Sequence, residues 1–253
     1  MKKTLITLMA LAGMASAETE LISINPLTSS SYWGTWSHAN NNTITNGVLS
    51  GSPNWQVDPS VFTLKGPVTF TNEQSFDFSF DITNNGTGNS MLTLAFIGSS
   101  HAVVVGHGTY ASPADQIQVA VTDNITAQGY GFATTHPTDD AQLTAGATLD
   151  GGLPTGGATT TLSGNISWDT DSWVLTLNSS AVAGQALTLD TGLTSFDLKK
   201  IMVTIEGGSS PTDGRNDWKT ATLSNMSVVI PEPATATLSL LALAGLAARR
   251  RRK

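Results

Sequence analysis

Hydrophobic and polar residues alternate strictly along Ser75–Thr83, which reads SFDFSFDIT. The apolar positions share one side of this stretch: Phe76, Phe78, Phe80 and Ile82. Asp77 and Asp81 fall on the other side. A period of two residues is typical of a β-strand with one buried and one solvent-facing side, so we predict such a strand here.

Further short runs of apolar residues alternate with clusters of Gly, Asn, Asp, Ser and Pro, which punctuate strands. The additional predicted strands are Met91–Ile97, Ala102–Val105, Gln116–Val121, Thr159–Trp168, Trp173–Asn178, Ala186–Leu189, Ile201–Ile205 and Ala221–Ile230. The first two are almost continuously apolar, as in strands buried on both faces. Asp169–Ser172 predicts a four-residue hairpin turn, and Ser195–Lys200 is the best helical stretch between the termini, at one or two turns.

Ten or more strands at short spacing predict an all-β protein, built as a single β-sandwich over residues 18–228. Their order and spacing resemble the jelly roll of concanavalin A-like lectins and laminin-G domains. We expect this sandwich to be flanked by an N-terminal signal helix and a C-terminal hydrophobic helix.

The N-terminus carries the three parts of a secretion signal in the required order. Lys2 and Lys3 give a positive start, Thr4–Met14 is apolar, and Ala15 and Ala17 are small residues that a signal peptidase accepts. The apolar run is too short for a comfortable membrane span, and an amphipathic first helix would need a polar face that it lacks. We predict a signal peptide over residues 1–17 and export from the cytoplasm.

At the C-terminus, Pro231, Glu232 and Pro233 precede Ala234–Ala248, an uncharged run rich in Leu and Ala. At 1.5 Å per helical residue, this run covers about 22 Å of a hydrocarbon core of roughly 30 Å. A helix must begin after the prolines, which would break it. Five terminal cations would stay on the cytoplasmic side: Arg249, Arg250, Arg251, Arg252 and Lys253.

This arrangement resembles the PEP-CTERM sorting domain of Gram-negative bacteria, over residues 229–253. The tail also goes by the name of ice-binding-protein C-terminal domain, a name that describes the tail and not the body. The resemblance implies transient membrane insertion and recognition by an exosortase, an integral-membrane cysteine transpeptidase. Cleavage would release or transfer the protein to the cell surface, often alongside exopolysaccharide. A tail that is kept as an anchor is the alternative.

The charge and the absence of cysteine exclude further classes of function. The body from Glu18 to Ile230 has five cations against 18 acids, a formal charge of −13, whereas the whole chain stands at −7. A body without a basic stripe is unsuited to nucleic acid. The chain has no cysteine, which excludes thiol catalysis, disulfides and cysteine-ligated metals.

Candidate catalytic groups have simpler structural interpretations. Asp77 and Asp81 lie four strand residues apart, about 13 Å, whereas a glycosidase pair needs roughly 5–10 Å. Some glycosidases of concanavalin A-like fold carry an E-x-D-x-x-E pattern, which this chain lacks, so we interpret the two aspartates as a solvent-facing strand. The histidines form no metal-binding cluster, and we expect them in turns or at strand ends: His38, His101, His107 and His136.

Two acidic turns contain candidate calcium ligands, Asp169 with Asp171 and Asp213 with Asp217. Neither turn has EF-hand spacing, and aspartate favours turns for local reasons. We therefore expect no cofactor, with Ca²⁺ as the alternative. Trp33 and Trp36 lie in the segment SYWGTWSHANNN, where rings and amides are suited to binding a sugar. The alternative is that tryptophans fill the core or its rim, as we expect for Trp55, Trp168, Trp173 and Trp218.

Together these features predict an exported, non-enzymatic β-sandwich that is processed by signal peptidase and exosortase and that binds extracellular polysaccharide or acts in adhesion. A secreted glycan-active hydrolase of concanavalin A-like fold, or a purely structural component of the envelope matrix, is the alternative.

Overall fold

The structure is a computed structural model. It describes residues 18–24, 33–38, 43–50, 58–83, 91–108, 116–126, 130–131, 141–142, 146–152, 158–206 and 222–231. The predicted signal helix and C-terminal hydrophobic helix lie outside these ranges. Within the ranges, no helix has the length and apolar character needed to cross a membrane.

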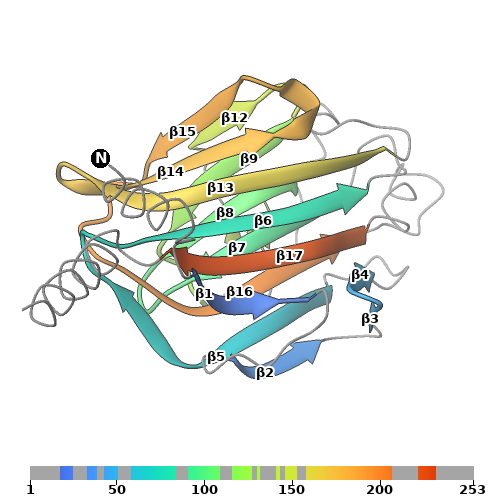
Figure 1. The fold of residues 1–253 in the computed structure, drawn as a ribbon, viewed down its shortest axis with the longest axis horizontal. Helices are drawn as coiled ribbons and strands as arrows, with labels where there is room; N and C mark the ends of the chain where they lie inside the picture. Colours follow the sequence, from blue (N-terminus) through green and yellow to red (C-terminus); the bar gives the residue numbers. More distant parts are fainter. Residues whose placement is uncertain are drawn as a thin grey trace, which may run out of the picture.

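Two antiparallel sheets are stacked face to face, as Figure 1 shows. The eight-stranded sheet has the order β15-β14-β13-β6-β17-β4-β3, and β1 also pairs with β17. Its strands are β1 (Glu18–Ser23), β3 (Thr43–Thr45), β4 (Val48–Ser50), β6 (Ser75–Thr83), β13 (Thr159–Asp169), β14 (Ser172–Ser179), β15 (Ala186–Asp190) and β17 (Thr222–Pro231).

The second sheet has seven strands in the order β12-β9-β8-β7-β16-β5-β2. Its strands are β2 (Trp33–His38), β5 (Asp58–Phe70), β7 (Met91–Ile97), β8 (Ala102–Gly108), β9 (Ile117–Thr122), β12 (Ala147–Leu149) and β16 (Phe196–Glu206). A small parallel pair, β10 (Tyr130–Gly131) and β11 (Ala141–Gln142), makes contact with β7 and β8 through β10. A 3₁₀ turn, η1 (Ser180–Val182), follows β14.

Aromatic rings fill the space between the two sheets. Phe76 and Phe78 of β6 lie against Phe96 of β7, with ring centroids 5.1 and 4.7 Å apart. Phe196 of β16 stacks on Phe76, and Trp173 packs beside it with no exposed surface. Aromatic pairs at these separations stabilise a core beyond their buried area. The predicted alternation of β6 is confirmed, because its residues are buried and half-buried in strict turn.

The central strands of the seven-stranded sheet are buried on both faces. Leu92, Leu94 and Phe96 of β7 face the main core, while the intervening Ala95 and Ile97 belong to a second apolar cluster on the outer face. This confirms the prediction for the continuously apolar strands β7 and β8.

Two local predictions are wrong. Ser195–Lys200 forms no helix, because Phe196 and Leu198 are buried at a spacing of two residues and begin strand β16. The turn between β13 and β14 has two residues and not four, because Asp169 pairs directly with Ser172. Thr170 adopts a φ of 50°, which closes the tight turn.

Candidate functional site

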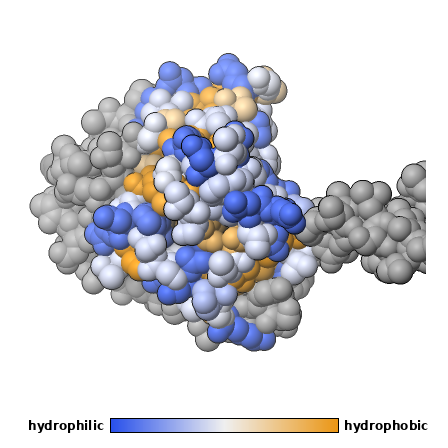
Figure 2. Space-filling model, turned by 90° about the vertical axis from the view of Figure 1, so that its left-hand side faces the viewer, coloured by the Kyte–Doolittle hydropathy of each residue, from blue (hydrophilic) through white to orange (hydrophobic). Residues whose placement is uncertain are grey.

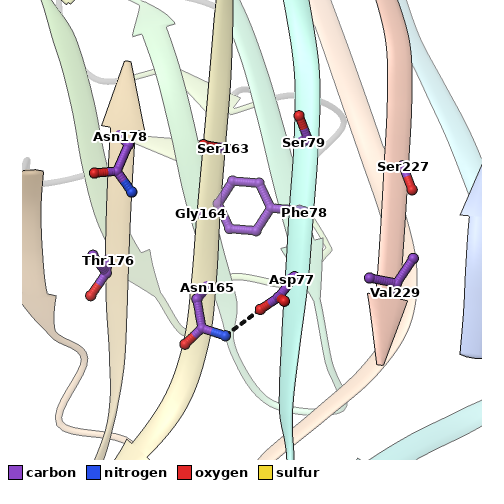
Figure 3. Close-up of a pocket in the computed structure, with 10 residues that line it drawn as sticks. All are labelled: Asp77, Phe78, Ser79, Ser163, Gly164, Asn165, Thr176, Asn178, Ser227 and Val229. Carbon is purple, nitrogen blue, oxygen red and sulfur yellow. Dashed lines mark hydrogen bonds between the residues drawn. The ribbon is translucent and has the colours of Figure 1, made fainter. Parts of the chain in front are cut away.

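A polar hollow lies on the outer face of the eight-stranded sheet and encloses about 380 Å³. Four neighbouring strands, β14, β13, β6 and β17, form its floor (Figure 3). Its volume falls within the range of small-molecule sites, roughly 300–1,000 Å³. The lining residues are Asp77, Phe78, Ser79, Ser163, Gly164, Asn165, Thr176, Asn178, Ser227 and Val229.

Strand register arranges the polar lining in two parallel rows. Because directly paired residues share one face of a sheet, each row crosses all four strands. One row is Thr176, Asn165, Asp77 and Val229. The other row is Asn178, Ser163, Ser79 and Ser227. Neighbours within a row lie on strands about 4.8 Å apart, and the rows are separated by about 7 Å along each strand.

Asp77 and Asn165 hold each other in one orientation within the hollow. The amide nitrogen Nδ2 of Asn165 donates a short hydrogen bond to Oδ1 of Asp77, drawn as a dashed line in Figure 3, and lies 3.5 Å from the carbonyl oxygen of Phe76. These bonds hold both side chains in one orientation. Among the described residues, no hydrogen bond engages the carbonyl oxygen Oδ1 of Asn165 or Oδ2 of Asp77. Both can therefore accept from a ligand.

Gly164 of β13 pairs directly with Phe78 of β6, and the Phe78 ring lies beside Gly164 (Figure 3). A Cβ atom on Gly164 would collide with this ring and would lie 2.8 Å from the carbonyl oxygen of Thr176. The sheet can close over Phe78 only because residue 164 has no side chain. Gly164 therefore allows the close approach of β13, which carries Asn165, to β6, which carries Asp77.

Beside the hollow, Asp81 is held by its neighbours across the sheet. Oδ1 of Asp81 accepts a 2.6 Å hydrogen bond from Thr161 Oγ1, and Oδ2 accepts one of 2.7 Å from Asn225 Nδ2. The carboxylates of Asp77 and Asp81 thus bind amide and hydroxyl donors of the same sheet. The eight strands of this sheet, as the structure bounds them, contain no lysine or arginine.

A third carboxylate, Asp190, accepts hydrogen bonds at the end of β15. Ser172 Oγ donates a 2.6 Å hydrogen bond to Oδ1 of Asp190, and the backbone N–H of Gly192 donates another of 2.9 Å. The hydroxyl bond and then the backbone bond lower the pKa of Asp190 below its ordinary value. Since one donor begins the neighbouring strand β14 and the other lies in the turn after β15, we interpret the group as structural.

The structure places the predicted site residues away from the hollow or outside the described residues. Trp33 and Trp36 belong to β2, the edge strand of the other sheet, where their backbones pair with Leu64 and Phe62; their side chains are not described. Trp173 is fully buried and Trp168 packs against it, so the predicted core role of these two is confirmed.

Among the described residues, the fold does not bring further metal ligands to the candidate calcium ligands. Asp169 ends β13 and accepts a hydrogen bond from Thr170, and Asp171 lies in the β13–β14 turn. Asp213 and Asp217 lie outside the described residues. In the described ranges, no three His, Asp or Glu side chains gather as a metal site. His101 directly precedes β8, and His107 is the penultimate residue of that strand.

Comparisons with known proteins separate the tail from the body. Residues 229–253 match the family model described as the PEP-CTERM protein-sorting motif. The chain ends in a PEP-CTERM sorting motif. A search of curated proteins finds no match.

The body is similar in fold to carbohydrate-recognition domains. The Emp47p carbohydrate recognition domain superposes with a TM-score of 0.53 at 13% identity, over 87% of this chain and 99% of that one. The exoplasmic/lumenal domain of VIP36, in a Ca²⁺/Man3GlcNAc-bound form, gives 0.50 at 12% identity, over 85% and 90%. An endo-1,3-beta-glucanase from Streptomyces sioyaensis gives 0.47 at 11% identity, over 74% and 77%, a score from which we draw nothing. The predicted concanavalin A-like lectin fold is confirmed; identities this low show the fold alone.

Sequence reasoning missed most of the hollow. Asp77 was considered only as one of a carboxylate pair, and Asn165, Asn178 and Thr176 were not singled out. The available signal was the run of Ser, Thr and Asn at alternate positions of β13 and β14, which would have indicated a polar outer face.

Proposed function

We propose that this exported protein is delivered to the cell surface through its sorting motif and that its β-sandwich binds a neutral extracellular glycan, without catalysis, in the hollow of the eight-stranded sheet. The observation that carries the proposal is the pair of polar rows centred on Asp77 and Asn165. Two proteins of similar fold support the proposal. The matched part of Emp47p is named a carbohydrate recognition domain, and VIP36 was solved in a Ca²⁺/Man3GlcNAc-bound form.

The rows suit a ligand rich in hydroxyl groups. Serine and threonine hydroxyls both donate and accept, the asparagine amides do both through separate atoms, and the Asp77 carboxylate accepts. A sugar ring presents hydroxyls in several directions from a rigid frame, so two rows across a flat sheet can engage neighbouring hydroxyls together. Charge-assisted bonds to Asp77 would be the strongest of these contacts.

Charge favours a neutral glycan over an acidic one. Asp77 lies in the hollow, Asp81 lies next to it, and Glu20 of β1 pairs with Val229 at its margin. The strands of this sheet contain no lysine or arginine. A polyanionic chain would therefore be repelled.

The spacing of the carboxylates supports a binding role. Asp77 and Asp81 are separated by about 13 Å along β6, beyond the roughly 5–9.5 Å that separates catalytic carboxyls in glycosidases. Each is also held by side-chain donors of the sheet, as in a preorganised binding surface.

The test is a glycan array followed by calorimetry on the exported protein, with and without Ca²⁺. We expect neutral glycans to bind and D77A and N165A to abolish binding. D123A, which removes an exposed acid directly after β9 of the other sheet, should bind as the unaltered protein does. A W33A/W36A double variant measures the predicted contribution of β2. Release of reducing sugar would favour the hydrolase, and no binding under any condition would favour the structural role.

A further inference from the structure

The sorting motif begins inside the folded body. The match to the motif starts at Val229, whereas β17 continues to Pro231. Val229, Ile230 and Pro231 therefore belong both to the last strand and to the segment that defines the motif. Only the residues from Glu232 onward follow the strand.

Both neighbours of β17 hold this overlap. On one side, Val229 pairs with Asp77 of β6. On the other side, Glu20, Thr19 and Glu18 of β1 pair with Val229, Ile230 and Pro231. Ile230 is 8% exposed and Val228 is fully buried, so the end of the strand is fixed by core packing as well as by pairing.

A processing enzyme reads its substrate as an extended chain with free backbone groups. Val229 is paired on both sides, whereas Ile230 and Pro231 are paired with β1 alone. Because this pairing occupies backbone groups of the segment, the strand must open locally before another protein can pair with the same groups. The folded body and the sorting enzyme thus compete for the same three residues.

We propose that the folded sandwich withholds Val229–Pro231 from the sorting enzyme, so that the chain is cut C-terminal to Pro231 and the mature protein keeps a complete β17. The inference rests on the exosortase processing proposed above. In the cut, the peptide bond breaks, its carbonyl passes to water or to an amine-bearing acceptor, and the tail leaves with a new amino group.

The same pairing brings the two processing sites together. Signal-peptide removal after Ala17 would make Glu18 the first residue, and Glu18 pairs with Pro231. Figure 1 shows the start of β1 beside the end of β17, and Figure 2 faces that end of the molecule, where hydrophilic residues surround small hydrophobic patches. Only Glu232 and Pro233 separate Pro231 from Ala234. Three residue steps reach at most about 10 Å, so this end lies at the membrane while the tail is inserted.

The inference is tested with the full chain in a Gram-negative host that carries an exosortase. Intact-mass analysis of the surface protein should give an N-terminus at Glu18 and a C-terminus at or beyond Pro231. In a spaced variant, the residues Gly-Ser-Gly-Ser-Gly-Ser-Val-Ile-Pro are inserted after Pro231, which rebuilds the motif outside the sheet. We expect pulse-chase labelling to show the tail removed about tenfold faster, because no strand must open.

The matched control inserts Gly-Ser-Gly-Ser-Gly-Ser-Gly-Ser-Pro at the same place, which adds the same length and keeps Pro-Glu-Pro intact without rebuilding Val-Ile. It should gain no speed, and both variants should melt at the temperature of the unaltered protein. A mature chain that ends before Pro231, or equal rates for the native and spaced chains, overturns this inference and leaves the sorting intact. An uncut tail in both chains overturns it together with the exosortase processing.

Discussion

Substitution of Gly164 by alanine should destabilise the sandwich through steric overlap at this one position. The new Cβ would meet the Phe78 ring and the Thr176 carbonyl oxygen, and the latter belongs to the backbone of β14 and cannot rotate away. Overpacking of this kind costs typically 1–3 kcal/mol. At about 3 °C per kcal/mol for a body of this size, G164A should lower the melting temperature by roughly 3–9 °C.

The matched control is Gly66→Ala in β5, where a Cβ would meet nothing within 4 Å. G66A should leave the stability unchanged or raise it slightly, since alanine restricts the unfolded chain more than glycine does. In urea denaturation, F78L should relieve part of the cost of G164A, so that the double variant is more stable than the sum of the single effects. Equal stability of G164A and the unaltered protein, or strict additivity with F78L, would refute the close approach of β13 over Phe78.

Three further predictions concern the core and one turn. Trp173 is fully buried, and its indole nitrogen has no partner among the described residues. In urea denaturation, W173A should lower the free energy of unfolding by roughly 3–5 kcal/mol, and W173F should lower it by less than half of that. Thr160 is fully buried, and its hydroxyl has no partner in the part of the chain that the structure describes. T160V should therefore leave the free energy of unfolding unchanged or raise it by about 1 kcal/mol, and a clear loss would contradict this. The lowered pKa of Asp190 means that its ionised form stabilises the fold above its unfolded pKa and that this contribution is lost as pH falls through the folded pKa. S172A should therefore be less stable than the unaltered protein near neutral pH, and the difference should shrink on acidification; a constant difference would contradict the assignment.

The sequence was most informative where the pattern was local and regular. β6 and β7 begin and end at the predicted residues, because alternation or continuous apolar character is uninterrupted along them. Asn46 and Gly47 form the positive-φ turn between β3 and β4, and this Asn-Gly pair was a hairpin signal that the sequence reading missed.

The longest strand could not be recognised from its pattern. β5 contains Gly66 and Pro67, which normally interrupt strands. The structure tolerates them because the pairing with β16 is irregular there, passing from Thr63 directly to Val68. Proline lacks a backbone N–H, so it fits where the ladder is broken.

The hollow depends on long-range register that no local pattern contains. Asn165 and Asp77 meet across paired strands although 88 residues separate them in the chain. The sequence could indicate that each strand has a polar face, but the order β14-β13-β6-β17 decides which polar residues become neighbours.

The central claim is tested most directly by calorimetric titration of the exported protein with a neutral glycan selected on the array, in parallel with D77A, N165A and D123A. The account predicts saturable binding without glycan breakdown, lost in D77A and N165A and retained in D123A. Binding that survives both hollow variants, or glycan that is cleaved during the titration, would contradict it.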